Sequence, residues 1–238
     1  MNQRGRTKRL LCAVILASGA MRAQGSPSGN SLTELRLHIV SSQPGKYRPL
    51  PAVIWLEPQA GTPTLPFAPR GHYTLLQKNR TFIPHLQVIP VGSVVQFPNA
   101  DPFFHNVFSL FDGKRFDLGL YEAGSSKSVT FPSEGVSYIF CNIHPEMSAV
   151  VLSLSTPLYA IAANDSFVLR NLPPGDYKLH VWIEGVPQAT LESLGRPVHL
   201  SSQTVDLGDL RVPFPRNSAL SHTNKFGRSY DTDPKSTY

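Results

Sequence analysis

Short apolar runs separated by turn residues limit the fold of this chain more than any other feature. Prolines and glycines stand between the runs, and the 238 residues include 22 prolines and 17 glycines. These residues interrupt helices, and no segment keeps the apolar period of a long amphipathic helix. We therefore expect an all-β protein, a sandwich or barrel of short strands. The expected strands are Leu35–Val40, Ala52–Glu57, Val88–Pro90, Ser93–Phe97, Ser126–Phe131, Tyr138–Cys141, Ala149–Leu154, Phe167–Arg170, Tyr177–Ile183 and Gln203–Val212.

The first 23 residues have the composition of an export signal. A basic stretch precedes the apolar run Leu10–Ala17, and the small residues Ser18–Ala20 follow it. Such a run is too short to span a bilayer and is typical of a cleaved secretory signal, with a retained signal anchor as the alternative. We therefore predict a signal peptide over residues 1–23, a location in the periplasm or outside the cell, and no membrane span in the mature chain.

The charge of the chain is concentrated in this leader. Of the formal net charge of +6, five positive charges come from basic residues before Gln24, where no acid is present. The rest of the chain is close to neutral, so the folded part lacks the basic footprint that a nucleic-acid binder needs. We expect no nucleic-acid partner. The five basic residues are Arg4, Arg6, Lys8, Arg9 and Arg22.

Potential metal ligands gather at the end of one expected strand. Cys141, His144 and Met147 follow one another in the pattern C-x2-H-x2-M, and His105 lies upstream. One thiolate and two imidazoles form the trigonal set of a mononuclear blue-copper site, in which a thioether is the weak axial ligand. Zinc fits this set less well, because a thioether is a poor zinc ligand. We therefore predict one copper ion held by His105, Cys141, His144 and Met147.

Other interpretations of these residues are structural. A single histidine is usually a surface or supporting residue, a single methionine usually lies in a core, and a buried cysteine is often an inert small apolar side chain. If the leader is removed, however, Cys141 is the only cysteine left. In an oxidising compartment an unpaired cysteine is a reactive thiol, an intermolecular link or a metal ligand.

Several neighbours of the four residues could support or surround the site. We expect Asn106 to hydrogen-bond across to the cysteine loop and Asp101 and Glu146 to shape a partner-docking surface. His85 is a structural residue, or alternatively a supporting group or substitute ligand. The carboxylates show no catalytic pairing, and the sequence holds no G-x-S-x-G or H-E-x-x-H motif. We therefore predict no catalytic residue.

The metal-ligand segment resembles the cupredoxin superfamily, in particular plastocyanins and amicyanins. The loop Cys141–Met147, with its proline after the histidine, is similar to the amicyanin ligand loop, and His105-Asn106 resembles the motif of the first ligand. Phe116–Gly119 and Cys141–His144 also resemble exported bacterial proteins called methylamine-utilisation or plastocyanin-like. The resemblance covers residues 33–155. It implies a Greek-key β-sandwich that carries single electrons between redox partners in the cell envelope and is not an enzyme.

The remaining segments complete the predicted organisation. Residues 24–32 are a linker, 156–213 a second β unit, and 214–238 a disordered tail without an apolar pattern. The run Asn171–Tyr177 in the second unit resembles a carboxypeptidase-regulatory or transthyretin-like β-sandwich, which implies docking or stability without chemistry. Residues 35–57 also resemble the opening of such a module, so the two units could interleave.

Two other functions remain open at this point. One is a copper-binding or copper-delivery protein with an open site. The other is an envelope interaction module that binds no metal.

Overall fold

The computed structural model describes residues 33–42, 49–69, 71–110, 113–201, 203–213, 224–226 and 228. The predicted signal peptide, the linker and most of the predicted tail lie outside these residues. Within the described part of the chain, no helix has the length and apolar character that crossing a membrane requires.

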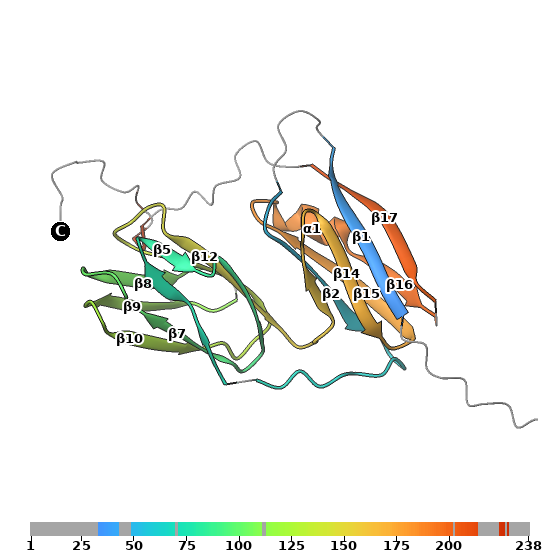
Figure 1. Ribbon diagram of the computed structural model, residues 1–238, viewed down its shortest axis with the longest axis horizontal. Coiled ribbons are helices and arrows are strands. Elements are labelled where there is room, and N and C mark those ends of the chain that lie inside the picture. The colour runs from blue at the N-terminus through green and yellow to red at the C-terminus, as the bar shows by residue number, and fades with distance from the viewer. Residues whose placement is uncertain are drawn as a thin grey trace, which may run out of the picture. The chain divides into compact units, whose positions relative to one another are not determined.

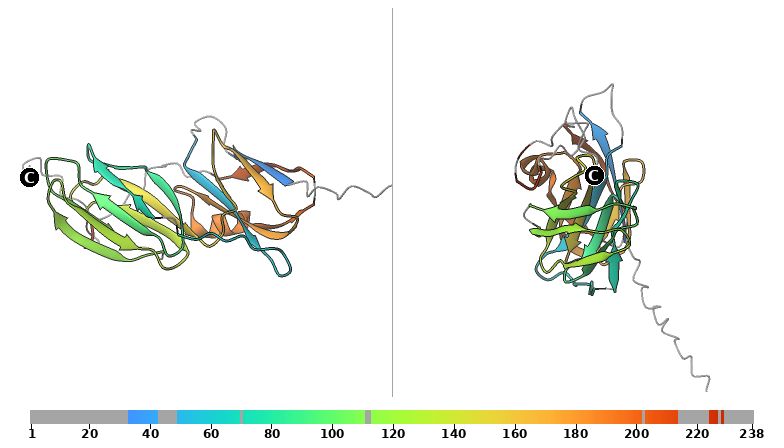
Figure 2. Two further views of the ribbon diagram at one scale, coloured as in Figure 1. Left: turned by 60° about the horizontal axis from the view of Figure 1, so that its bottom comes forward. Right: turned by 90° about the vertical axis from the view of Figure 1, so that its left-hand side faces the viewer.

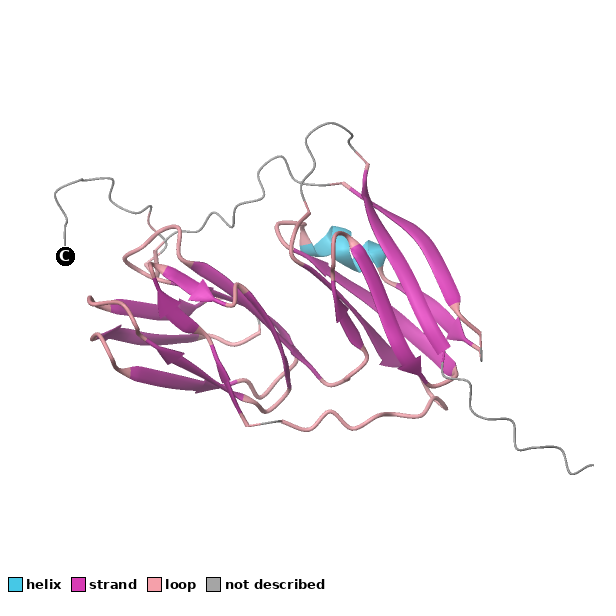
Figure 3. Cartoon of the chain, viewed as in Figure 1, coloured by secondary structure: helices cyan, strands magenta, loops and turns pink. Residues whose placement is uncertain are grey.

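The expected all-β class is confirmed, because the described residues form strands and one short helix, α1 (Gln188–Leu194) (Figure 3). The strands are β1 (Thr33–Ser41), β2 (Ala52–Pro58), β3 (His72–Thr74), β4 (Leu76–Lys78), β5 (Thr81–Ile83), β6 (Leu86–Pro90), β7 (Val94–Pro98), β8 (His105–Ser109), β9 (Phe116–Tyr121), β10 (Ser126–Thr130), β11 (Gly135–Phe140), β12 (Ser148–Leu154), β13 (Tyr159–Ile161), β14 (Ser166–Leu172), β15 (Gly175–Ile183), β16 (Arg196–Leu200) and β17 (Val205–Val212).

Strands β3 to β12 form the part of the fold that carries the predicted ligands. Five of them make a sheet in the order β6-β12-β11-β8-β9, three make a sheet in the order β10-β7-β3, and β4 pairs with β5. Phe97 from one sheet and Val107, Ile139 and Val151 from the other belong to one buried apolar cluster. Two sheets that share such a core form a β-sandwich.

The position of strand β12 between two apolar clusters explains why its sequence is a nearly continuous apolar run. Successive side chains of a strand point to opposite faces of the sheet. Ala149 and Val151 belong to the cluster just described, whereas Val150, Leu152 and Leu154 belong to a second buried cluster with Leu35, Ile54 and Leu179. Both faces of β12 are therefore buried, and polar alternation is absent.

The strand pairing corrects the predicted domain boundaries. Residues 33–58 were expected to open the copper domain, but β1 pairs with β14 and β17, and β2 pairs with β13 and β15. In Figures 1 and 2 the blue first strand runs beside the orange-red last strand. Alternate residues Leu35, Leu37 and Ile39 of β1 are buried together with Phe167 and Leu169 of β14. Strands from both ends of the chain are needed to bury this apolar face, which gives the interleaved arrangement.

Candidate metal centre

Two antiparallel strands bring His105 and Cys141 together from positions far apart in the sequence. His105 is the first residue of β8, and Cys141 directly follows β11. Phe108 of β8 and Phe140 of β11 are register partners. The first end of β8 therefore lies beside the loop that leaves β11, and this loop contains His144.

The loop between β11 and β12 is closed by its own backbone. The Cys141 N–H donates to the Met147 carbonyl (3.1 Å), and the Met147 N–H donates to the His144 carbonyl (3.0 Å). These two bonds fold the segment into a tight turn, which turns the His144 ring back toward the cysteine. The C-x2-H-x2-M spacing therefore lets a single turn bring the side chains of the cysteine and the histidine close together.

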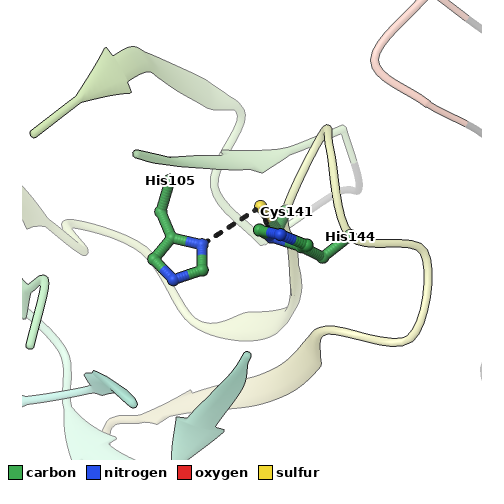
Figure 4. A group of neighbouring side chains, drawn as sticks. All are labelled: His105, Cys141 and His144. Atoms are coloured by element: carbon green, nitrogen blue, oxygen red, sulfur yellow. Dashed lines mark hydrogen bonds between the residues drawn. The ribbon is translucent and has the colours of Figure 1, made fainter. Parts of the chain in front are cut away.

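The three side chains meet at their potential ligand atoms. His105 Nδ1 lies 3.7 Å and His144 Nδ1 3.5 Å from Cys141 Sγ, and the three ligand atoms lie within 4.8 Å of one another. Figure 4 shows both imidazole rings turned toward the sulfur. His105 and Cys141 are fully buried, and His144 is partly buried.

These separations fit a metal ion between the three groups. A divalent ion with bonds of about 2.3 Å to sulfur and about 2.0 Å to nitrogen holds the two ligand atoms about 3.5 Å apart at a tetrahedral angle. At a trigonal angle the separation is about 3.7 Å. The observed distances cover this range. The side chains are thus placed for ligation without rearrangement of the backbone.

The hydrogen bond of His105 and the pKa of His144 suit ligation. His105 Nε2 donates to Asp101 Oδ2 (2.8 Å), which leaves Nδ1 as the nitrogen that faces the sulfur. Burial is the main cause that lowers the pKa of His144 to about 4, and electrostatic interactions with His105 and Arg80 act in the same direction. His144 is therefore neutral at neutral pH, as a metal ligand must be.

The environment of Cys141 opposes the thiolate in the protein without metal. Burial raises the pKa of the thiol, and hydrogen bonds from the backbone N–H groups of Asn106, Ile143 and His144 act in the opposite direction. The same three N–H groups would stabilise a thiolate once a cation is present. Metal binding would then release the thiol proton.

Met147 and Glu146 lie at the end of the loop. Met147 is fully buried in the same apolar cluster as Cys141. Its role as an axial ligand stays a prediction. Glu146 is exposed, as expected for a surface residue.

Asp101 was expected on a partner-docking surface, but the structure buries it, with only 5% of the residue exposed. Its carboxylate accepts hydrogen bonds from His105 and from the backbone N–H groups of Asn79 (2.6 Å) and Arg80 (3.0 Å). Burial alone would raise the pKa of Asp101, but these donors hold it below its ordinary value. A charged, fixed acceptor behind His105 explains the orientation of that ring.

The side chains of Asn106 and His85 make contacts that differ from some of those expected. Asn106 Nδ2 donates to Asp117 Oδ1 (2.8 Å), and it is the backbone N–H of Asn106 that faces Cys141. Both nitrogens of His85 have partners, the Ser148 carbonyl (3.1 Å) and Glu184 Oε1 (2.6 Å). His85 therefore has the structural role, not that of a substitute ligand.

No sequence pattern indicated that Phe103 would be a neighbour of the site. Its ring centroid lies 5.2 Å from that of His105 and 5.7 Å from that of His144. The guanidinium carbon of Arg80 lies over the Phe103 ring, 5.3 Å from its centroid. Phe103 thus helps to shield the histidine pair from water.

The comparison with solved structures finds similarity to copper proteins over part of this chain. No protein family and no curated protein matches the sequence. A purple cupredoxin from Nitrosopumilus maritimus shares 25% identity over 36% of this chain and 100% of its own, with a TM-score of 0.32. A copper-containing nitrite reductase from Thermus scotoductus SA-01 shares 25% identity over 41% of this chain and 25% of its own, with a TM-score of 0.34. A mutant of amicyanin in its reduced state shares 20% identity over 38% of this chain and 92% of its own, with a TM-score of 0.34. Two of these three proteins are cupredoxins, and the third is a copper-containing enzyme.

Proposed function

We propose that this chain is a type 1 copper protein that transfers single electrons between redox partners and is not itself an enzyme. The observation that carries the proposal is the meeting of His105 Nδ1 and His144 Nδ1 at 3.7 and 3.5 Å from Cys141 Sγ. Two imidazoles and one thiolate form the trigonal set that selects copper in electron-transfer sites.

Each residue has one role in the proposed site. Cys141, His105 and His144 would hold one copper ion, and Met147 would supply a weak thioether ligand. Copper in such a site supplies one-electron chemistry through its Cu(I) and Cu(II) states. The buried positions of His105 and Cys141 exclude water from two of the ligands, and Asp101 fixes the His105 ring. A fixed ligand geometry keeps the rearrangement between oxidation states small, which favours rapid transfer.

The proposed partners are redox proteins of the cell envelope, reached after export through the leader of residues 1–23. Phe104 and Ile143, which neighbour His105 and His144 in the chain, are exposed apolar residues. Apolar residues at the surface beside a site offer a contact area to a partner. N-terminal sequencing of the protein recovered from the periplasm would test the export step, and an intact Met1 would contradict it.

Copper titration of the purified metal-free protein tests the proposed function. We expect one equivalent of Cu(II) to give an intense visible thiolate-to-copper band and a type 1 EPR spectrum. Cys141→Ser is the matched control, because it removes the sulfur and keeps a side chain of similar size; it should fold and lack the band. Copper binding without this band would indicate a delivery protein, and the absence of binding would indicate an interaction module without metal.

A further inference from the structure

A short turn near the C-terminus lies at the metal end of the fold. The Asn224 side chain accepts hydrogen bonds from the N–H groups of Phe226 (3.0 Å) and Arg228 (3.1 Å), and the Asn224 N–H donates to the Arg228 carbonyl (2.8 Å). Within the predicted tail, these hydrogen bonds join residues 224, 226 and 228, which the structure describes. The turn leaves Phe226 exposed and directs Lys225 toward the protein.

Lys225 contacts two segments that carry proposed ligands. Its backbone N–H donates to Asn142 Oδ1 (2.9 Å), and its Nζ donates to Asp117 Oδ2 (2.7 Å). The Lys225 side chain is one quarter exposed, and the Asp117 side chain is 40% exposed. The two contacts join the C-terminal turn to the cysteine loop and to strand β9.

Both acceptors, Asn142 and Asp117, are close neighbours of residues that carry the proposed ligands. Asn142 directly follows Cys141 in the loop. Asp117 accepts a second hydrogen bond from Asn106, which follows His105 and whose backbone N–H donates to the Cys141 sulfur. A chain of contacts therefore runs from Lys225 through Asp117 and Asn106 to the thiol.

We propose that Lys225 is a positioning residue of the metal centre, which holds the segments of His105 and Cys141 together from the C-terminal turn. The predicted effect on the copper ion rests on the proposed function. The predicted effect on the opening of the cysteine loop concerns the metal-free protein and does not depend on copper. In Lys225→Gln the backbone N–H bond to Asn142 can still form, but the ion pair with Asp117 is lost, and Asp117 keeps an uncompensated negative charge near the site. The turn is then held less firmly against the cysteine loop, so the loop opens more often, and the added negative field favours the oxidised ion.

Three variants of the full chain separate this role from a general loss of charge. Lys225→Gln removes the ion pair, Lys225→Arg restores a cation that can reach Asp117, and Arg228→Gln removes one charge from the same turn. Arg228 is the matched control, because its backbone closes the turn.

The first measurement uses the metal-free protein. The rate of iodoacetamide labelling at Cys141, followed by mass spectrometry of the peptide that contains it, reports how often the loop opens. We expect Lys225→Gln to label about fivefold faster than the parent, which corresponds to about 1 kcal/mol, and Lys225→Arg and Arg228→Gln to stay close to the parent. High salt should bring the parent toward the Lys225→Gln rate, because it screens an exposed ion pair.

The second measurement uses the copper-loaded protein. Lys225→Gln should lower the reduction potential by more than Arg228→Gln does, and Lys225→Arg should restore it. Equal labelling of Lys225→Gln and the parent, or equal effects of Lys225→Gln and Arg228→Gln, would overturn the proposal. A parent that binds no copper would contradict the proposed function, whereas the labelling rates would still decide the role of Lys225.

Discussion

The Asp101 carboxylate accepts a hydrogen bond from Nε2 of His105 at 2.8 Å and is thereby the direct support of a proposed ligand. The contact fixes which ring nitrogen is free to bind a metal, and it places a negative charge behind the ring. Partners of this kind are often as important to a metal site as the ligands themselves.

Replacing this carboxylate should change the proposed copper site without removing it. In Asp101→Asn the His105 ring loses a charged acceptor, so we expect a higher reduction potential and a Cu(II) affinity about 10- to 100-fold weaker. Voltammetry and competition with a copper chelator measure the two quantities. Glu122→Gln removes an exposed carboxylate and is the control. An unchanged potential in Asp101→Asn would show that the contact only supports the fold.

The axial position can be tested at Met147. A weak axial thioether adjusts the reduction potential more than it holds the metal. Met147→Gln should therefore keep copper and lower the potential, while Met147→Leu, which stays apolar, should keep copper and raise it. The two variants shift the potential in opposite directions only if residue 147 faces the metal. Equal potentials in both variants and the parent would place the side chain solely in the apolar cluster.

The pair of His85 and Glu184 should make stability depend on pH. The hydrogen bond that His85 Nε2 donates to the Glu184 carboxylate is the main cause that raises the pKa of His85 above its ordinary value, against the effect of burial. The unfolded chain has the ordinary value of about 6.5. Protonated His85 therefore stabilises the fold fully below about pH 6.5, and this contribution is lost as the pH rises through the higher folded pKa.

Urea denaturation of the parent and of His85→Gln at several pH values measures this contribution. Because the His85 side chain is 41% exposed, we expect the parent to exceed the variant by at most about 1 kcal/mol in acid. The difference should shrink above neutral pH. A difference that grows with rising pH would mean that His85 stabilises the fold as a neutral group.

The sequence was informative where the chemistry is local. Cys141, His144 and Met147 could be recognised together because one turn of the chain carries all three. Lys225 could not be recognised, since its partners Asn142 and Asp117 are distant in the sequence and a single lysine carries no pattern. Strand β1 looked like the start of the copper domain for the same reason: alternating apolar residues specify a buried face but not the strand that covers it.

The pairing of β1 and β2 predicts how the chain responds to truncation after Ser155. That truncation keeps β3 to β12 and every proposed ligand, but it removes β13 to β17, the pairing partners of β1 and β2. Leu35, Leu37 and Ile39 of β1 would then be exposed together with the second-cluster face of β12.

An apolar surface of this kind beside unpaired strand edges promotes aggregation. We therefore expect the truncated chain to sediment with the insoluble fraction, whereas a chain that ends after Pro213 keeps β1 to β17 and stays soluble. Sedimentation followed by gel analysis compares the two. A soluble chain ending at Ser155 that binds copper with the parent spectrum would show instead that β3 to β12 fold without β13 to β17. In that case the apolar face of β12 would not need its second cluster.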